Sequence, residues 1–238
     1  MTAHAVAALS ARFGTEVPPV LWTPPDPRRT AAEPAPLIEE LDVDETTALD
    51  VLAAPEVRIE ARATGALDTR LCLARAGHLT ARVVRAAGTA TVDLPHCDGS
   101  ADRLAALVAP VLGDAAPADP AVAASFPAEE GRAALRAGDA GEVGAALRAI
   151  GVDPDAARLI GRVFARSQRS VEFTVHAGDH RSAAVVAVID SPAGRVVVRT
   201  AREPGSGTWI SVADGSAHRI GRALRRACEE LPGGGWTP

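Results

Sequence analysis

The chain has 238 residues, a formal net charge of −5 and an apolar content of 47%, enough for one or two domains with a full core. All 25 basic residues are arginine, and there is no lysine, tyrosine or asparagine, which excludes a Schiff-base lysine, a lysine-dependent phosphate loop and a tyrosine general acid. The arginines are interleaved with Asp and Glu, so a nucleic-acid partner is not expected.

The cysteines and the longest apolar run bear on where the protein works. Cys72, Cys97 and Cys228 stand far apart without C-x-x-C spacing, which is typical of free thiols in a reducing compartment. The run from Ala183 to Ile189 has seven residues and is too short to span a membrane. Residues 2–9 lack a basic leader and a convincing cleavage site, which favours an amphipathic helix over a signal peptide. We therefore expect a cytoplasmic protein with no membrane partner.

The first part of the chain predicts an extended entry, two short helices, a strand meander and a longer helix. The prolines between Pro18 and Pro27 prevent a helix there. Helical patterns at Leu37–Leu41 and Leu49–Leu52 end at Pro55. Alternating patterns then predict four strands, near residues 56–60, 71–73, 79–84 and 89–92. The next helix starts at Asp98-Gly99-Ser100 and has one apolar face, formed by Leu104, Leu107, Val108, Val111 and Leu112.

The second part repeats this order. Asp139 can cap a helix that carries Val143, Leu147 and Ile150, and Gly151 can end it. Asp153-Pro154 opens a helix with an apolar stripe of Ala156, Leu159, Ile160, Val163 and Phe164. Four strands are expected near residues 169–176, 182–190, 194–200 and 207–212. The closing helix is expected to bury Ala217, Ile220, Leu224, Ala227 and Leu231 and to expose Arg222, Arg225, Arg226 and Glu229.

The two parts are also related in their residues. Asp98-Gly99-Ser100-Ala101 recurs as Asp214-Gly215-Ser216-Ala217, an offset of 116 positions. Val83-Val84-Arg85 is likewise echoed by Val197-Val198-Arg199. A period of this length is too long for a solenoid, and it predicts two similar halves about a pseudo-twofold axis.

The predicted fold class is therefore α+β, with an N-terminal half over residues 1–127 and a C-terminal half over 128–238. The Ala-, Pro- and Asp-rich stretch Gly113–Pro127 is interpreted as the segment that separates the two repeated blocks. After the last helix, Gly233–Gly235 predicts a frayed tail, from which Trp236 folds back or touches a partner.

The candidate reactive groups do not converge. His96-Cys97-Asp98 cannot form a nucleophile and its base, because adjacent residues of an extended segment point to opposite faces. His176, Asp179 and His180 flank a turn and could reach one metal ion, but no further ligand is near in the sequence to complete four. A solvated hairpin tip is favoured there over a zinc site. We expect no catalytic residue, no metal and no cofactor.

The order and spacing of several segments resemble the EspG family, the ESX secretion-associated proteins of actinobacterial type VII secretion. The likeness covers residues 17–231 and departs in a shorter segment from Glu33 to Pro55 and in Gly205–Gly207, which replaces a longer insertion. It is carried by the proline-bounded entry, Arg29-Thr30, Glu33, Leu37, Leu41, Leu49, Leu52, Arg166–Val175, Val188-Ile189-Asp190 with Pro192, Gly194-Arg195 and Trp209–Val212.

The resemblance implies a central antiparallel sheet flanked by helical bundles. It further implies a cytosolic chaperone that binds PE–PPE heterodimers, or another helical ESX substrate, and keeps them soluble for export. A groove that covers an apolar helical tip would serve this purpose without ATP, metal or covalent chemistry.

Strand alternation suggests where the partner binds. Trp209, Arg195 and Arg199 should share the sheet face opposite Ile210, Val196 and Val198, unless that second face is also covered and Trp209 is core. The helix from Pro154 to Arg166 is expected to form the other wall of the groove. The candidate partner-binding residues are Trp209, Arg195, Arg199, Arg158, Arg162 and Arg166.

Two hypotheses from other functional classes remain open. One is an enzyme or small-ligand protein with an enclosed pocket near His176 or His180. The other is a self-assembling scaffold without a client, and the possibility of a homodimer is left open as well. A shallow apolar groove between sheet and helices would favour the chaperone over the enzyme.

Overall fold

The computed structural model describes residue 20 and residues 43–65, 68–87, 89–182, 184–203, 205 and 207–236, which form an α+β fold with one ten-stranded sheet. The strands are β1 (Val57–Thr64), β2 (Arg70–Ala76), β3 (Leu79–Ala86), β4 (Thr89–Asp93), β5 (Ala123–Pro127), β6 (Arg169–Ala177), β7 (His180–Arg181), β8 (Val185–Ser191), β9 (Gly194–Glu203) and β10 (Gly207–Asp214). The helices of this described part are α2 (Val43–Ala53), α3 (Ala101–Leu112), α4 (Ala128–Leu135), α5 (Ala140–Ala149), α6 (Pro154–Ala165) and α7 (Ala217–Glu229).

Two four-strand meanders meet in the middle of the sheet. The strand order is β4-β3-β2-β1-β6-β8-β9-β10-β5, with β7 paired to β6 at the side, and every pair is antiparallel. The first strands of the two meanders, β1 and β6, pair from Val57 opposite Ala177 to Thr64 opposite Ser170. The predicted strands are thus confirmed, and the meanders continue into one sheet.

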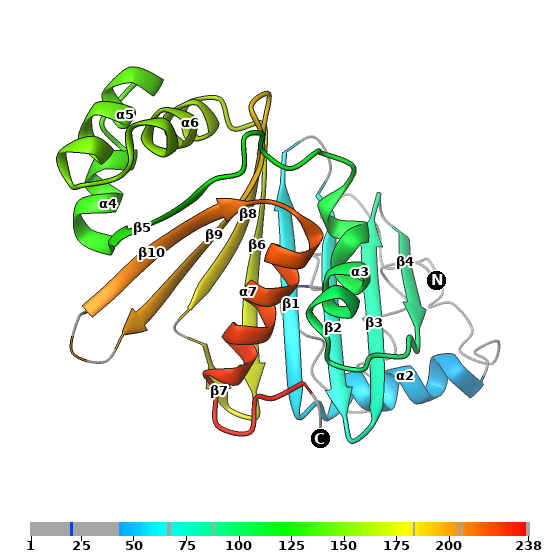
Figure 1. Cartoon of the computed structure of the whole chain (residues 1–238). Helices are drawn as coiled ribbons and strands as arrows, with labels where there is room; N and C mark the ends of the chain where they lie inside the picture. The colour runs from blue at the N-terminus through cyan, green and yellow to red at the C-terminus, as the bar shows by residue number, and fades with distance from the viewer. Residues whose placement is uncertain are drawn as a thin grey trace, which may run out of the picture.

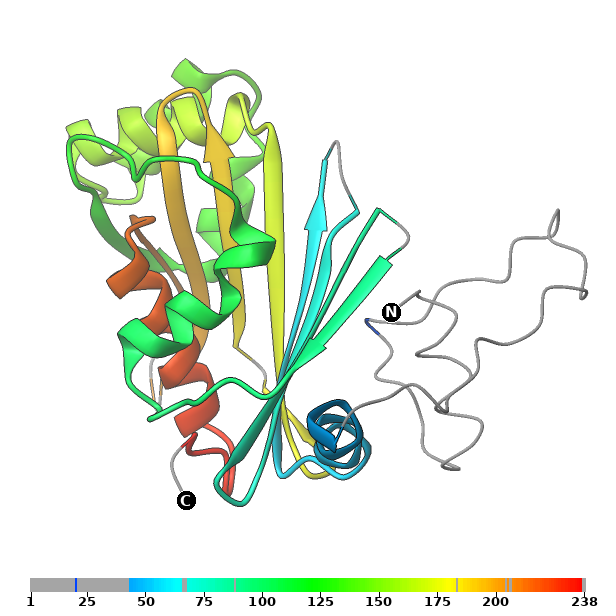
Figure 2. The same ribbon diagram turned by 90° about the vertical axis from the view of Figure 1, so that its right-hand side faces the viewer.

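Helices cover both faces of this sheet. On one face, α3 and α7 pack over the core that contains Ile59, Phe173 and Val197, as Figures 1 and 2 show. On the opposite face, α4, α5 and α6 cover Val196 and Ile210 at the end of the sheet that holds β9 and β10. Helix α2 covers β2 to β4 on this same opposite side, as Figure 2 shows. Period-2 alternation along the strands therefore sorts neighbouring residues into separate cores.

Side chains fix the starts of three helices. Ser100 accepts a hydrogen bond from the backbone N–H of Arg103 at the start of α3. Asp139 and Glu142 form a reciprocal capping box at α5, and Asp153 caps α6 directly before Pro154. Such caps satisfy N–H groups that lack a partner within the helix. The caps predicted at 139 and 153 are confirmed.

Two contacts join residues that lie 116 positions apart. Ile59 pairs with Val175 in the sheet, and the Asp102 carboxylate lies 3.2 Å from His218 Nδ1 between α3 and α7. The N-cap residues Ser100 and Ser216 have the same backbone angles, φ −64° and ψ 151°. Buried residues of α3 recur at the same offset in α7: Leu104, Ala105, Leu107, Val108, Val111 and Leu112 correspond to Ile220, Gly221, Ala223, Leu224, Ala227 and Cys228.

A two-fold axis through both contacts would produce these offsets. The duplication itself stays a prediction, and superposition of residues 56–112 on 169–231 tests it.

Three predictions need correction, and a further group concerns residues that the structure does not describe. Residues 123–127 do not form a connecting segment, because they pair with β10 as the edge strand β5. The tail is not frayed: Trp236 folds back and is 3% exposed, and Arg75 donates a hydrogen bond to the Gly235 carbonyl. Ala217 is exposed at the first position of α7, and Leu231 lies beyond its end. The predicted helices at residues 2–9 and 37–41 and the entry at 18–27 fall outside the described residues, except for Val20.

We predict that Gly221→Ala destabilises the protein by about 2 kcal/mol, because the new methyl group would overpack the contact between α7 and α3. A Cβ at Gly221 would lie 1.8 Å from the carbonyl oxygen of Ala101. Gly144→Ala is the matched control, since its Cβ would lie 3.4 Å from the nearest backbone atom, in ordinary contact. Urea unfolding measures both variants, and equal stabilities would contradict the prediction.

Candidate partner-binding surface

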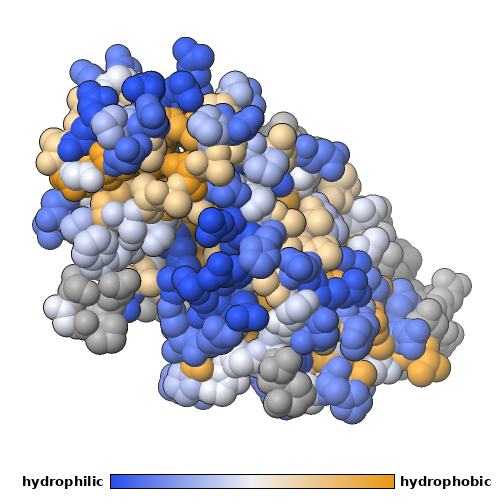
Figure 3. Space-filling view, viewed as in Figure 1, coloured by the Kyte–Doolittle hydropathy of each residue, from blue (hydrophilic) through white to orange (hydrophobic). Residues whose placement is uncertain are grey.

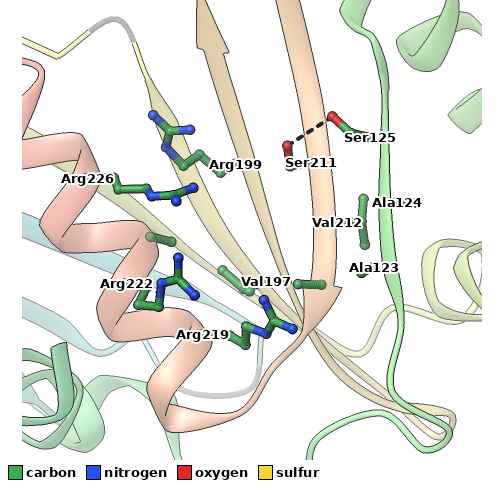
Figure 4. A pocket seen from close by; sticks show the side chains of 12 residues that line it. Ala123, Ala124, Ser125, Val197, Arg199, Ser211, Val212, Arg219, Arg222 and Arg226 are labelled. Atoms are coloured by element: carbon green, nitrogen blue, oxygen red, sulfur yellow. Dashed lines mark hydrogen bonds between the residues drawn. The ribbon is translucent and has the colours of Figure 1, made fainter.

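A groove runs between α7 and the strands β9, β10 and β5, on the face of the sheet that α7 covers only in part. It has a volume of about 380 Å³. Figure 4 shows α7 along one side of the groove and the strands along the other. Twelve residues line it: Ala123, Ala124, Ser125, Val197, Arg199, Ser211, Val212, Ala213, Arg219, Arg222, Ala223 and Arg226. We call this surface the α7 groove.

The floor of the α7 groove consists of small side chains. Ala123 and Ser125 of β5 lie opposite Ala213 and Ser211 of β10, and the two serine hydroxyls are 3.2 Å apart. Since the neighbouring residue Phe126 points into the opposite core, no bulky side chain rises from this part of the floor. The floor is therefore flat and only weakly polar.

Arginines form the wall of the groove. Arg219, Arg222 and Arg226 are spaced i, i+3 and i+7 on α7, and the fourth arginine, Arg199, comes from β9. The guanidinium groups extend into the space between helix and strands, as Figure 4 shows. None of the twelve lining residues carries a carboxylate. In the space-filling view of Figure 3, hydrophilic residues gather in the middle of this face.

The four arginines differ in how far they are already paired. Arg199 forms an ion pair with Glu230 just after α7, and Arg219 lies 3.7 Å from Asp214. Arg222 and Arg226 are exposed and have no ion pair within the described part of the chain. The groove thus presents two uncompensated positive charges one helical turn apart.

The predicted site residues are divided between the two faces of the sheet. Trp209 and Arg199 lie on the face of the α7 groove, as the alternation predicts, and Trp209 is partly buried two residues before Ser211. Ile210 and Val196 point into the opposite core. The sheet therefore places Trp209 beside the groove.

The prediction that Arg195 binds a partner needs correction. It is 5% exposed, pairs with Asp190 at 2.6 Å and donates to the carbonyls of Leu112 and Gly113 at the end of α3. Arg169 donates to the carbonyls of Val111 and Leu112 as well. Arg195 consequently stabilises the end of a helix and is not available to a partner.

We predict that Asp190→Asn costs about 3 kcal/mol of unfolding free energy, because it leaves the buried Arg195 guanidinium without its counter-charge. Asp155→Asn provides the control: it breaks an exposed pair with Arg158 on α6 and should cost less than about 1 kcal/mol. Urea unfolding at neutral pH compares the two. A cost for Asp190→Asn no larger than that of the control would argue against the structural role of this pair.

Arg158, Arg162 and Arg166 lie on the other side of the sheet. All three are exposed on or just after α6, which packs on the core of Val196 and Ile210. Arg162 and Arg166 border a separate hollow of about 530 Å³ with Asp119, Pro192 and Ala193. The prediction of one groove between Trp209 and this helix is therefore wrong, because the sheet lies between them.

The histidines considered for an enzyme do not form a site. His176 pairs with Arg181 across the β6–β7 hairpin and His180 with Ala177, so the two imidazoles point to opposite faces. Burial, reinforced by Arg58 and Arg181, lowers the pKa of His176 from 6.5 to about 4. Its Nε2 atom lies 3.9 Å from the Glu60 carboxylate. Neither histidine lines the hollows described above.

The remaining reactive groups are protonated or dispersed. Cys72, Cys97 and Cys228 are free, and burial raises the pKa of each thiol, that of Cys228 to about 12. Among the residues that the structure describes, no three His, Cys, Asp or Glu side chains gather as metal ligands. No helix in the described ranges is long and apolar enough to cross a membrane.

The sequence interpretation missed the arginines of α7. It treated Arg222 and Arg226 as a solvated helix face and singled out no role for Arg219. Their i, i+3 and i+7 spacing was the available signal. What the spacing does not reveal is that β5 extends the sheet beside this helix and turns an exposed face into the wall of a groove.

Comparison with known proteins shows a family and two similar proteins. The family model described as "EspG family" matches residues 2–226. The ESX-3 secretion-associated protein EspG3 of Mycolicibacterium smegmatis is 36% identical over 99 residues, which are 39% of this chain and only 33% of that relative. The type VII secretion system chaperone EspG5 of Mycobacterium tuberculosis, solved in complex with a PE25–PPE41 dimer, has the same fold: the TM-score is 0.77 at 20% identity, over 99% of this chain and 97% of that one.

Proposed function

Since this chain belongs to the EspG family, we propose that it is a specificity chaperone of a type VII secretion system. In this proposal it binds a PE–PPE-type helical heterodimer in the cytoplasm and keeps that client soluble until export. The observation that carries the proposal is the family match over residues 2–226. The shared fold of a chaperone captured with a PE–PPE dimer supports it, as does the resemblance to EspG3.

The physical role is to cover apolar surface. A helical export substrate with an exposed apolar end tends to aggregate, and a folded partner that buries this end prevents it. Binding supplies the whole activity, so no acid, base or nucleophile has to converge. This activity assigns no chemical step to the histidines or to the buried thiols.

We place the client on the α7 groove, beside Trp209. This surface combines a large aromatic side chain, an uncovered floor of small residues and the exposed guanidinium groups of Arg222 and Arg226. Trp and Arg are the residue types that most often dominate the energy of an interface. The exposed face of α6, with Arg158, Arg162 and Arg166, is the second candidate surface on the opposite side of the sheet.

The proposed function predicts a stoichiometric helical partner. The chain, tagged at its C-terminus, is co-expressed with the PE–PPE-type pairs of its own genome, purified and analysed by mass spectrometry and light scattering. The expected result is one heterodimer bound to one chaperone, stable through gel filtration. Recovery of a self-associated chain without any such partner would favour the scaffold, and tight retention of a small molecule would favour the ligand-binding reading.

The proposed surface predicts that Trp209→Ala weakens client affinity about thirtyfold, roughly 2 kcal/mol, because a large contact area is lost. Adding Arg199→Glu should weaken binding further, with thermal unfolding used to confirm that both variants fold. Arg162→Glu, Arg166→Glu serves as the comparison on the other face and should bind the client normally. Loss of binding in this comparison variant alone would move the client to α6.

A further inference from the structure

One part of the sheet lacks a helix on the side of α3 and α7. These two helices lie side by side over the central strands, whereas β10 and β5 extend beyond α7, as Figure 1 shows. Ala123, Ser125 and Ser211 are exposed there. Within the described residues, the helical layer therefore ends at α7 while the sheet continues for further strands.

We propose that an acidic amphipathic helix of the client occupies this space and lies alongside α7 as a third helix of the layer. The identity of the partner as the client rests on the proposed chaperone function. The chemistry of the helix is argued from the groove alone, and it deepens the proposal by stating which kind of segment the site recognises.

The dimensions of the space fit one helix. Neighbouring strands are about 4.8 Å apart, so that β9, β10 and β5 together span about 10 Å, close to the diameter of an α-helix with its side chains. The small floor residues Ala123, Ser125, Ser211 and Ala213 allow a helix to approach the sheet closely. Small apolar residues on the sheet-facing side of the incoming helix would complement this floor.

The arginines of the groove specify which residues the incoming helix carries on its flank that faces α7. Arg222 and Arg226 have no carboxylate partner in the described structure, and Arg219 and Arg199 stand at either side of them. Carboxylates one turn apart on the incoming helix can pair with this row, because both rows repeat at about the same helical rise. A second copy of this chain fits less well, since docking through the same groove brings arginine rows together.

The test begins with a synthetic helix in place of the client. The probe is an Ala- and Leu-based peptide of about four turns, with Glu at i, i+4 and i+7 along one flank, and the control peptide carries Gln at those positions. Amide NMR spectra of the full chain are recorded with up to about 1 mM peptide, a concentration that detects even millimolar binding. We expect the Glu peptide, and not the Gln peptide, to shift the amides of Ser125, Ser211 and Arg222.

Charge-reversal variants then test whether the peptide contacts the arginines of α7. Arg222→Glu, Arg226→Glu should weaken the Glu peptide about tenfold or more, because two ion pairs become repulsions. The matched control is Arg132→Glu, Arg136→Glu, which makes the same charge change at exposed positions one turn apart, on and just after α4. The control should bind the Glu peptide like the wild type, and wild-type binding should weaken as salt is raised.

The outcomes separate this inference from the proposed function. Absence of peptide shifts in the groove, or equal binding by the Arg222→Glu, Arg226→Glu variant and its control, overturns the acidic-helix site. A client that co-purifies but is indifferent to the Arg222→Glu, Arg226→Glu variant also overturns it, while the chaperone function stands. If the Glu peptide binds as expected but no PE–PPE-type client is ever recovered, the acidic-helix site stands and the proposed function fails.

Discussion

The antiparallel pairing of β1 with β6 is the contact on which the rest of the structure depends. It joins two meanders, each made of strands close in sequence, into one sheet with a continuous core on the side of α3 and α7. Val57, Ile59 and Ala61 on β1 and Val171, Phe173 and Val175 on β6 bury their side chains there. Because each strand contributes to the same core, neither meander has a complete apolar face without the other.

The strand β5 lengthens the sheet at the end that holds β10. Each meander is followed by one helix, and α3 and α7 pack against each other above the sheet. β5 is an additional strand next to β10, which widens the sheet only on the side of α7. The added width creates the floor of the α7 groove, so a segment whose composition suggests a connection supplies part of this surface. An otherwise ordinary row of helix arginines becomes a wall for the same reason.

Local patterns in the sequence predict most of the fold. Alternation identifies the eight meander strands, and Asp139 and Asp153 mark helix starts, because both signals depend on neighbouring residues. The alternation also places Trp209 and Arg199 on one face. What it cannot predict is set by distant contacts: Arg195 is buried because α3 ends above it, and β5 is a strand because β10 offers it a free edge. An arginine such as Arg195 looks the same in the sequence whether it faces solvent, a core or a groove.

The hydrogen bonds at the end of α3 have a consequence for biosynthesis. The last carbonyls of this helix are satisfied by Arg169 and Arg195, which follow it by more than fifty positions. During translation, residues 57–112 leave the ribosome before those arginines exist, with the outer edge of β1 also unpaired. An exposed strand edge next to an incomplete helix end is prone to pair with other chains. The nascent segment 57–112 therefore passes through an interval in which its strand edge and its last helix carbonyls lack their partners.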